Sequence, residues 1–184
     1  MCAYTKLSRR LNFSVHGMEA IAEAVTTAGA SVGYDQLKDE QVKVLCTFVE
    51  GRDVFVSLPT GFGKSLCYML LPLVFDYLTV DSDRASDGKA IVVVVSPLIA
   101  LMEDQVASYS AKGIKAAFID CESDSDKKAS VCEGAYQLVL FSPEALISNR
   151  RWRQMLREQP YVSRLVALVI DEAHCVKKWY IFSV

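Results

Sequence analysis

The residues TGFGKS, at positions 60–65, combine two glycines with a Gly-Lys-Ser triplet between an apolar, β-branched run and a long apolar stretch. The two glycines allow a tight backbone turn whose N–H groups point inward at an anion. The lysine can reach the β- and γ-phosphate oxygens of a nucleotide, and the serine hydroxyl can ligate Mg²⁺. The residues expected around the phosphates are Pro59, Thr60, Gly61, Phe62, Gly63, Lys64 and Ser65.

The strict phosphate-loop pattern has glycine at the position of Leu58, so this chain departs from it by one residue. The alternative interpretation is a chance glycine turn. Because glycine makes up about 7% of residues in proteins, a G-x-G-K-[ST] match arises by accident in roughly one chain in a hundred of this size. The placement between a strand and a helix, which phosphate binding requires, lowers those odds further.

A second cluster, DEAH, follows the apolar run LVALVI. Asp171 at the end of this run can hold Mg²⁺ through water, and Glu172 can accept a proton from an attacking water. His174 is a candidate relay between the nucleotide and a moving part of the protein. Taken alone, Asp-Glu after a strand also fits a solvated turn, and a lone histidine is often structural. Together with the loop, the cluster indicates a nucleotide-hydrolysis site. The expected catalytic residues are Lys64, Asp171, Glu172 and His174, and the expected metal ligands are Ser65 and Asp171.

Short β-branched runs alternate with helical stretches along the chain. The expected strands are residues 54–57, 91–96, 116–119, 138–141 and 165–170. The runs IVVVV and LVALVI are apolar on both faces, as buried parallel strands are when helices cover the sheet. This alternation predicts an α/β fold, a three-layer sandwich with a mainly parallel sheet and right-handed crossovers. Upstream, apolar spacing predicts a helix over residues 18–28, closed by Gly29, and another over 37–50, closed by Gly51.

The totals limit the class of protein. The chain has 184 residues, six cysteines and a net charge of −2. The charge excludes a globally basic nucleic-acid footprint, so any such binding needs a local patch. The scattered cysteines lack metal-ligand spacing and indicate reduced thiols in the nucleus or cytoplasm. The apolar runs are too short to span a membrane. Residues 1–31 are expected to form a loose, mildly basic tail and the short helix, in preference to a transit peptide.

With TGFGKS and DEAH both in place, the chain resembles the first RecA-like domain, the ATP-binding half, of a superfamily 2 helicase. The closer resemblance is to the RecQ family of DNA helicases, whose signature blocks stand here in order. These blocks are VGYDQLKDEQ (32–41), LPTGFGKSLCY (58–68), VVVVSPLIALMEDQV (92–106), FSPEAL (141–146) and DEAHCVKKW (171–179). The resemblance covers about residues 32–179, which we expect to form one RecA-like domain.

The resemblance implies an adenine-recognition segment at Tyr34, Lys38 and Gln41. An aromatic ring and a cationic side chain can sandwich a purine, and the Gln41 amide offers a donor and an acceptor to the adenine edge. The family usually has arginine where Lys38 stands, so planar stacking is expected to be weaker here. The implied cofactors are ATP and Mg²⁺.

The resemblance also implies contacts with the nucleic-acid backbone at two strand-to-helix turns, where free N–H groups can meet phosphates. The matching residues are Ser96, Pro97 and Leu98 in the first turn and Ser142, Pro143 and Glu144 in the second. Ser-Pro is also a common helix start, which is the alternative interpretation. The implied partner is single-stranded or forked DNA, and RNA stays open.

Residues 149–159, NRRWRQMLREQ, are basic and include a tryptophan, which also suits nucleic-acid binding. The alternative is a helix that turns its apolar residues inward and leaves its arginines in solvent. We favour this alternative, with Trp152, Met155 and Leu156 partly buried.

After Trp179 the sequence departs from the family, and residues 180–184, YIFSV, are not expected to belong to the domain. The resemblance implies a second RecA-like domain in a longer parent, together with an arginine finger supplied by that domain. We therefore expect an incomplete helicase core that binds MgATP and does not unwind DNA alone. The alternatives are a non-catalytic module that binds nucleotide or a partner, an RNA helicase, and a P-loop ATPase outside the helicases.

Overall fold

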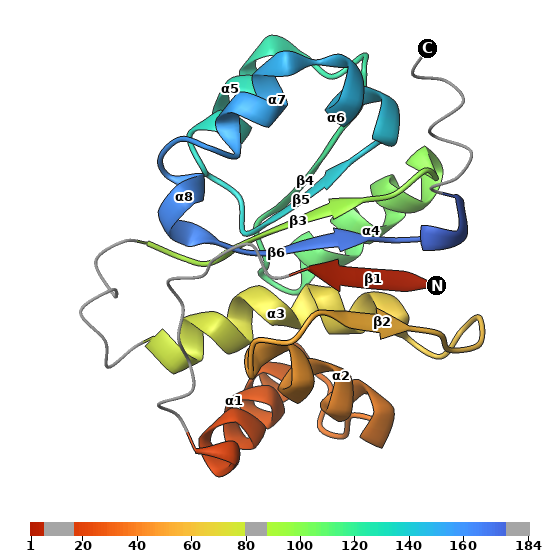
Figure 1. The fold of residues 1–184 in the computed structure, drawn as a ribbon, viewed down its shortest axis with the longest axis vertical. Helices are drawn as coiled ribbons and strands as arrows, with labels where there is room; N and C mark the ends of the chain where they lie inside the picture. Colours follow the sequence, from red (N-terminus) through yellow and green to blue (C-terminus); the bar gives the residue numbers. More distant parts are fainter. Residues whose placement is uncertain (6–16, 80–87, 176–184) are drawn as a thin grey trace.

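The computed structural model describes residues 1–5, 17–79 and 88–175 of the 184-residue chain. Its strands form a 6-stranded sheet in the order β2-β1-β6-β3-β5-β4 (Figure 1). The strands are β1 (Cys2–Thr5), β2 (Val54–Val56), β3 (Ile91–Val95), β4 (Ala116–Ile119), β5 (Leu138–Phe141) and β6 (Leu165–Ile170). Strands β3 to β6 are parallel to one another, whereas β1 runs antiparallel to both of its neighbours, β2 and β6. The mainly parallel sheet confirms the predicted α/β class.

Helices cover both faces of the sheet, which makes the fold a three-layer sandwich (Figure 1). They are α1 (Met18–Ser31), α2 (Asp39–Val49), α3 (Lys64–Thr79), α4 (Ile99–Ala111), α5 (Ser125–Cys132), α6 (Pro143–Ser148), α7 (Arg150–Met155), α8 (Tyr161–Arg164) and the 3-10 turn η3 (Ala173–Cys175). Helices α1 to α4 pack on one face and α5 to α8 on the other. Alternate residues of one strand point to opposite faces of the sheet. In β3, Val92 and Val94 pack in the core under α1 to α4, and Ile91 and Val93 pack in the core under α5 to α8.

The five strands expected from the sequence are confirmed to within a residue. β2 and β3 each end one residue earlier than expected, at Val56 and Val95, and the other three have the expected bounds. Helix α2 is also confirmed, and Gly51 follows it with a φ of 100°, in the left-handed region where a helix commonly ends.

The prediction that Gly29 closes the first helix is wrong, because α1 continues through it to Ser31. A Cβ on Gly29 would lie 3.0 Å from the Tyr34 carbonyl oxygen and 3.3 Å from the Leu37 side chain. Gly29 therefore gives room for close packing against the following loop, which a side chain would crowd, and it does not cap the helix. The left-handed turn after the helix falls on Gly33, with a φ of 85°.

The prediction of a loose N-terminal tail is wrong for Cys2–Thr5, which form β1 in the interior of the sheet. The reason is backbone pairing on both sides: Tyr4 lies opposite Val54 of β2 and opposite Val169 of β6. Residues 6–16 of the expected tail, residues 80–87, and residues 176–184 with the expected C-terminal segment lie outside the described residues. No helix in the described ranges is both long and apolar enough to cross a bilayer.

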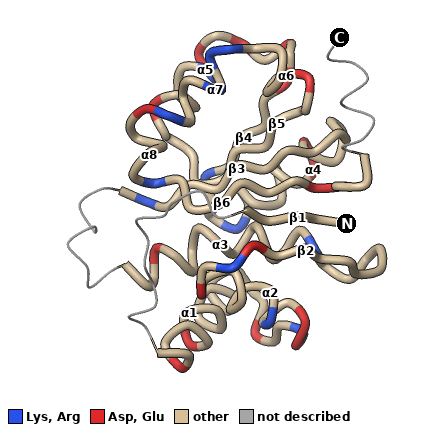
Figure 2. The backbone as a smooth tube through the Cα atoms, in the orientation of Figure 1, with Lys and Arg blue, Asp and Glu red and all other residues tan. Residues whose placement is uncertain are grey.

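Helix α7 confirms the interpretation of residues 149–159 as a packed helix. Trp152 and Met155 are buried, with Trp152 edge-on to Phe141 at 5.1 Å between ring centroids, and Leu156 is half-buried. The arginines of α7 are exposed. Figure 2 shows acidic and basic residues on both helical layers, in keeping with the small net charge.

Candidate functional site

The glycine loop connects β2 to α3. Gly61 and Gly63 have φ values of 78° and 87°, in the left-handed region that glycine adopts without strain. Lys64 is the first residue of α3, and its ammonium donates hydrogen bonds to the carbonyl oxygens of Leu58 and Pro59 at 3.0 and 3.1 Å. The lysine thus folds back over the loop, beside the N-terminal end of a 16-residue helix. Both the ammonium and that helix end are positive, which suits an anion.

Leu58, which replaces the first glycine of the strict pattern, causes no backbone strain. Among the described residues, Glu172 is the single non-glycine residue with positive φ, so Leu58 has a conformation open to any L-residue. Its carbonyl oxygen accepts from Lys64, and its side chain packs against the apolar core. The departure from the pattern therefore leaves the glycine turn intact.

Gln41 of α2 braces the loop. Its Nε2 donates to the carbonyl oxygens of Phe62 and Gly63 at 3.1 and 3.2 Å, and its Oε1 accepts from the Lys38 backbone N–H at 3.0 Å. A Cβ at Gly63 would lie 2.6 Å from Nε2, so a glycine is required for this approach. The sequence did not reveal this bracing role, and the contact of Gln41 with adenine stays a prediction.

A pocket of about 450 Å³ lies beside the loop and brings together Tyr34, Lys38 and Gln41, the three residues expected to recognise adenine. The Lys38 ammonium lies over the Phe62 ring, 4.0 Å from its centroid. The volume falls in the range of small-ligand sites, about 300–1,000 Å³. Loop residues Gly61, Gly63 and Ser65 line the same pocket.

A wall of this pocket comes from α4, which the sequence analysis did not assign to the site. Its residues are Asp104, Gln105, Ser108 and Tyr109. These residues recur at helical spacing and therefore share one face of the helix. This polar face is the feature of the sequence that could have indicated a role in the site. The spacing alone could not show that the stripe faces the glycine loop.

Asp171 stands at the carboxyl end of β6 with 6% of its surface exposed. Its Oδ1 accepts hydrogen bonds from the Cys2 thiol at 2.8 Å and from the Glu172 backbone N–H at 2.9 Å, and its Oδ2 accepts from the Tyr68 hydroxyl at 3.4 Å. Burial raises the pKa of Tyr68, which keeps this hydroxyl protonated as a donor.

Tyr68 lies one turn after Lys64 on α3, so the helix that carries the loop lysine also contacts the carboxylate. Lysine and aspartate thus lie at the same end of the sheet, where α/β proteins bind ligands.

Glu172 and His174 lie beside Asp171 but nearer to solvent. Glu172 has a φ of 48°, a conformation that costs a non-glycine residue about 1–3 kcal/mol and that clusters at functional sites. Its Oε2 lies 3.1 Å from Nδ1 of His174 and 3.5 Å from the Met1 ammonium. The His174 side chain is 58% exposed. The pair is therefore accessible to solvent.

The six residues expected to contact nucleic acid differ in burial. Three are buried: Ser96, Ser142 and Pro143. Pro97 is half-buried, and the side chains of Leu98 and Glu144 are exposed.

The buried serines already have partners for their backbone N–H groups. Ser96 N–H donates to Phe141 of β5, and Ser142 N–H to Ile119 of β4, each at 3.0 Å. The Ser142 hydroxyl also accepts from the Ala145 N–H at 3.2 Å and caps α6, as in the helix-start interpretation. Nucleic-acid contact at the two turns stays a prediction.

Comparison with known proteins gives matches over most of the chain. The DEAD/DEAH box helicase family matches residues 38–183. The "ATP-dependent DNA helicase RecQ" of Synechocystis sp. is 35% identical over 151 residues, which cover 80% of this chain and 28% of the relative. The protein of the same name from Haemophilus influenzae is 32% identical over 160 residues, 85% of this chain and 23% of the relative. The "ATP-dependent helicase SGS1" of Saccharomyces cerevisiae is 32% identical over 146 residues, 77% of this chain and 10% of the relative.

The chain therefore spans less than a third of the length of each of these relatives. The family match includes the glycine loop, the DEAH cluster and both Ser-Pro turns. The structure supplies the α/β sheet that such a domain needs. The chain belongs to the DEAD/DEAH box helicase family, and the relatives it resembles there are RecQ-type DNA helicases.

Proposed function

We propose that this chain binds MgATP and single-stranded DNA as the first RecA-like domain of a RecQ-type helicase. The observation that carries the proposal is the meeting of Lys64 and Asp171 at one end of the sheet, linked through Tyr68 of α3. The pocket beside the glycine loop is lined by Tyr34 and Lys38, an aromatic and a cationic side chain that can enclose a purine. The names of the relatives support DNA as the nucleic acid.

Each residue of the site has a proposed role. The loop N–H groups and Lys64 hold the β- and γ-phosphates at the positive end of α3. Ser65 and Asp171 supply oxygen atoms, the ligands that Mg²⁺ prefers, and Mg²⁺ held there would neutralise phosphate charge. Glu172 accepts the proton of the attacking water. His174, whose Nδ1 lies 3.1 Å from the Glu172 carboxylate, links the nucleotide to a moving part of the protein.

We further propose that the purified chain binds MgATP with little turnover and displaces no DNA strand. In the family that it resembles, ATP is held between two RecA-like domains. The second domain supplies an arginine finger, which accelerates phosphoryl transfer by about 10³–10⁵-fold. His174 is exposed and Glu172 is half-buried beside it, which leaves the pair accessible to such a domain.

A nucleotide titration of the purified chain tests the proposal. Lys64→Ala is expected to abolish MgATP binding, because it removes the ammonium from the phosphates. Lys115→Ala, which changes an exposed lysine immediately before β4, is the matched control and is expected to bind normally. Equal affinity in wild type and Lys64→Ala would overturn the proposal. ATP turnover with and without single-stranded DNA then separates a hydrolysing domain from a module that only binds, and strand displacement by the purified chain would overturn the second part.

A further inference from the structure

Strand β1 runs against its neighbours in the interior of a sheet whose other described strands are parallel. It precedes residues 38–183, so the family match assigns it no role. Its alternate residues Cys2 and Tyr4 are buried on the face of the sheet that α3 covers. Each contacts one half of the candidate site. The Tyr4 hydroxyl donates to the Lys64 carbonyl oxygen at 3.2 Å, and the Cys2 thiol donates to Asp171 Oδ1 at 2.8 Å.

The Cys2 contact decides which oxygen of Asp171 stays available. A carboxylate offers about four lone-pair positions, two on each oxygen. On Oδ1 both are taken, by the Cys2 thiol and by the Glu172 N–H, whereas on Oδ2 the donor in the described chain is the Tyr68 hydroxyl, at a long 3.4 Å. Oδ2 therefore keeps acceptor capacity for a metal ion.

We propose that Cys2 is a positioning residue of the nucleotide site: by holding Oδ1 of Asp171, it leaves Oδ2 for the magnesium of MgATP. The inference rests on the proposed function, because it assigns a partner to the carboxylate that would hold that magnesium. The backbone supports this role, since Ala3 pairs with Ile170 and so fixes Cys2 beside Asp171. Strand β1 is then part of the site.

Two substitutions separate positioning from simple core filling. Cys2→Ser keeps a donor in place but puts a hydroxyl among apolar groups, whereas Cys2→Val keeps an apolar side chain and removes the donor. Positioning requires that the valine variant need a higher Mg²⁺ concentration for ATP binding and that the serine variant need the same concentration as wild type. Core filling requires that the valine variant behave as wild type. The matched control is Cys67→Val: Cys67 is also fully buried, burial raises its pKa to about 12, and it packs in the same core layer.

The measurement is the affinity of the full chain for ATP at a series of free Mg²⁺ concentrations, by titration calorimetry, with thermal unfolding as a check on folding. Cys2→Val is expected to raise the Mg²⁺ concentration that gives half of the full increase in ATP affinity by about 10–100-fold. This is the range for losing a residue that supports a metal ligand. For Cys2→Ser and Cys67→Val, this Mg²⁺ concentration is expected to stay within about twofold of the wild-type value.

The outcomes distinguish this inference from the proposed function. A folded Cys2→Val variant with wild-type magnesium dependence overturns the positioning role and leaves the proposed function standing. A folded Cys2→Ser variant that needs a higher Mg²⁺ concentration than wild type also overturns it, whether or not the valine variant folds. Absence of magnesium-dependent ATP binding in the wild type overturns both.

Discussion

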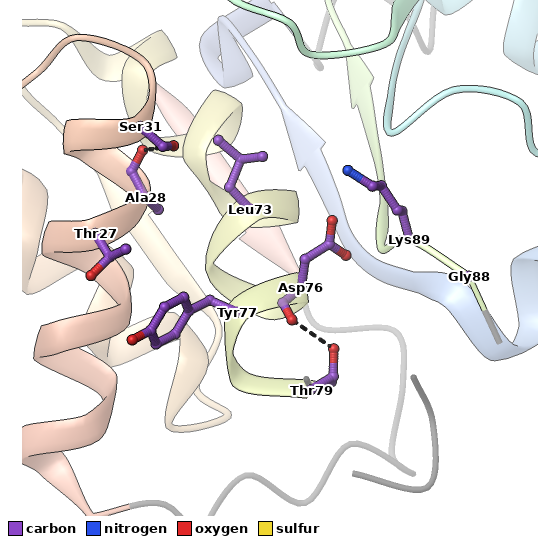
Figure 3. A pocket seen from close by; sticks show the side chains of 9 residues that line it. All are labelled: Thr27, Ala28, Ser31, Leu73, Asp76, Tyr77, Thr79, Gly88 and Lys89. Atoms are coloured by element: carbon purple, nitrogen blue, oxygen red, sulfur yellow. Dashed lines mark hydrogen bonds between the residues drawn. The ribbon is translucent and has the colours of Figure 1, made fainter. Parts of the chain in front are cut away.

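Two aspartates with hydrogen-bonded carboxylates stand at opposite ends of the sheet. Asp171 follows the carboxyl end of β6, whereas Asp76 of α3 lies at the amino ends of β3 and β5. There the Asp76 carboxylate accepts from the Ala90 backbone N–H at 2.6 Å and from the Gln137 side-chain amide at 3.0 Å. Burial raises the pKa of Asp76. Figure 3 shows its side chain in a pocket of about 440 Å³ between α1, α3 and Lys89.

The pocket beside Asp76 and the pocket beside the glycine loop have nearly the same volume, about 440 and 450 Å³. Volume and a shielded carboxylate therefore do not define a nucleotide site. What differs is the end of the strands at which each carboxylate lies. At the carboxyl ends the glycine turn leads into α3, which begins at Lys64 and donates a hydrogen bond to Asp171 through Tyr68. At the amino ends Asp76 ties β3 to β5 through Ala90 and Gln137.

The largest expected effect separates the two carboxylates. Asp171→Asn is expected to weaken magnesium-dependent ATP binding by at least about a hundredfold, since loss of a residue that merely supports a metal ligand costs about 10–100-fold. Asp76→Asn is expected to stay within about twofold, as for a substitution away from the site. Calorimetric titration of both variants checks this, and equal losses would break the comparison.

The glycine of the loop is expected to matter more than a glycine elsewhere. Gly63→Ala adds left-handed strain of about 1–2 kcal/mol and displaces the Gln41 hydrogen bonds, each worth about 1 kcal/mol. Gly113→Ala adds the strain alone, because its φ is 80° and its added Cβ meets no atom within 4 Å. Urea unfolding should show the larger loss at Gly63, together with weaker ATP binding. Indistinguishable stabilities would mean that Gln41 does not brace the loop.

An aromatic residue from each pocket offers a third comparison. Tyr34→Ala is expected to cost ATP binding about 1–3 kcal/mol, the range for losing a base-stacking ring, whereas Tyr77→Ala beside Asp76 leaves it unchanged. Fluorescence titration with a labelled adenine nucleotide measures both. A greater loss of affinity in Tyr77→Ala than in Tyr34→Ala would place the nucleotide in the pocket beside Asp76.

The smallest expected effect is a pH dependence of stability at Asp76. Because the pKa of this carboxyl is raised in the folded chain, folding favours its protonated form. Its stabilising contribution is fully present below the ordinary value of 3.8 and is lost as the pH rises through the raised folded value. Asp76→Asn removes this contribution, so the difference in free energy of unfolding between wild type and variant should change across that window. Urea unfolding at several acidic pH values tests it, and parallel pH profiles for the two proteins would contradict it.

The sequence was informative where the pattern is local. A glycine turn between an apolar run and a helix fixes the loop at Lys64, and the end of the apolar run fixes Asp171. Their meeting followed from a general property of parallel sheets, whose strands end at one edge. The fold class was accessible for the same reason, because IVVVV and LVALVI are apolar on both faces.

The features that escaped depend on contacts between distant segments. The four residues CAYT of β1 are too few for a periodic pattern, and their partners lie in β2 and β6. Gln41 reads as a polar helix residue until the loop carbonyls 21 and 22 residues later are placed beside it. Gly29 looked like a helix end because glycine commonly follows a helix. Its close neighbours, Tyr34 and Leu37, come from the loop that folds back over it, which the sequence does not show.

The most direct test of the central claim is a crystal structure of the chain with Mg²⁺ and a non-hydrolysable ATP analogue. The phosphates are expected within hydrogen-bond distance of the loop N–H groups and Lys64, with Mg²⁺ between Ser65 and Asp171. A nucleotide bound in the pocket beside Asp76, or phosphates held away from Lys64, would contradict it.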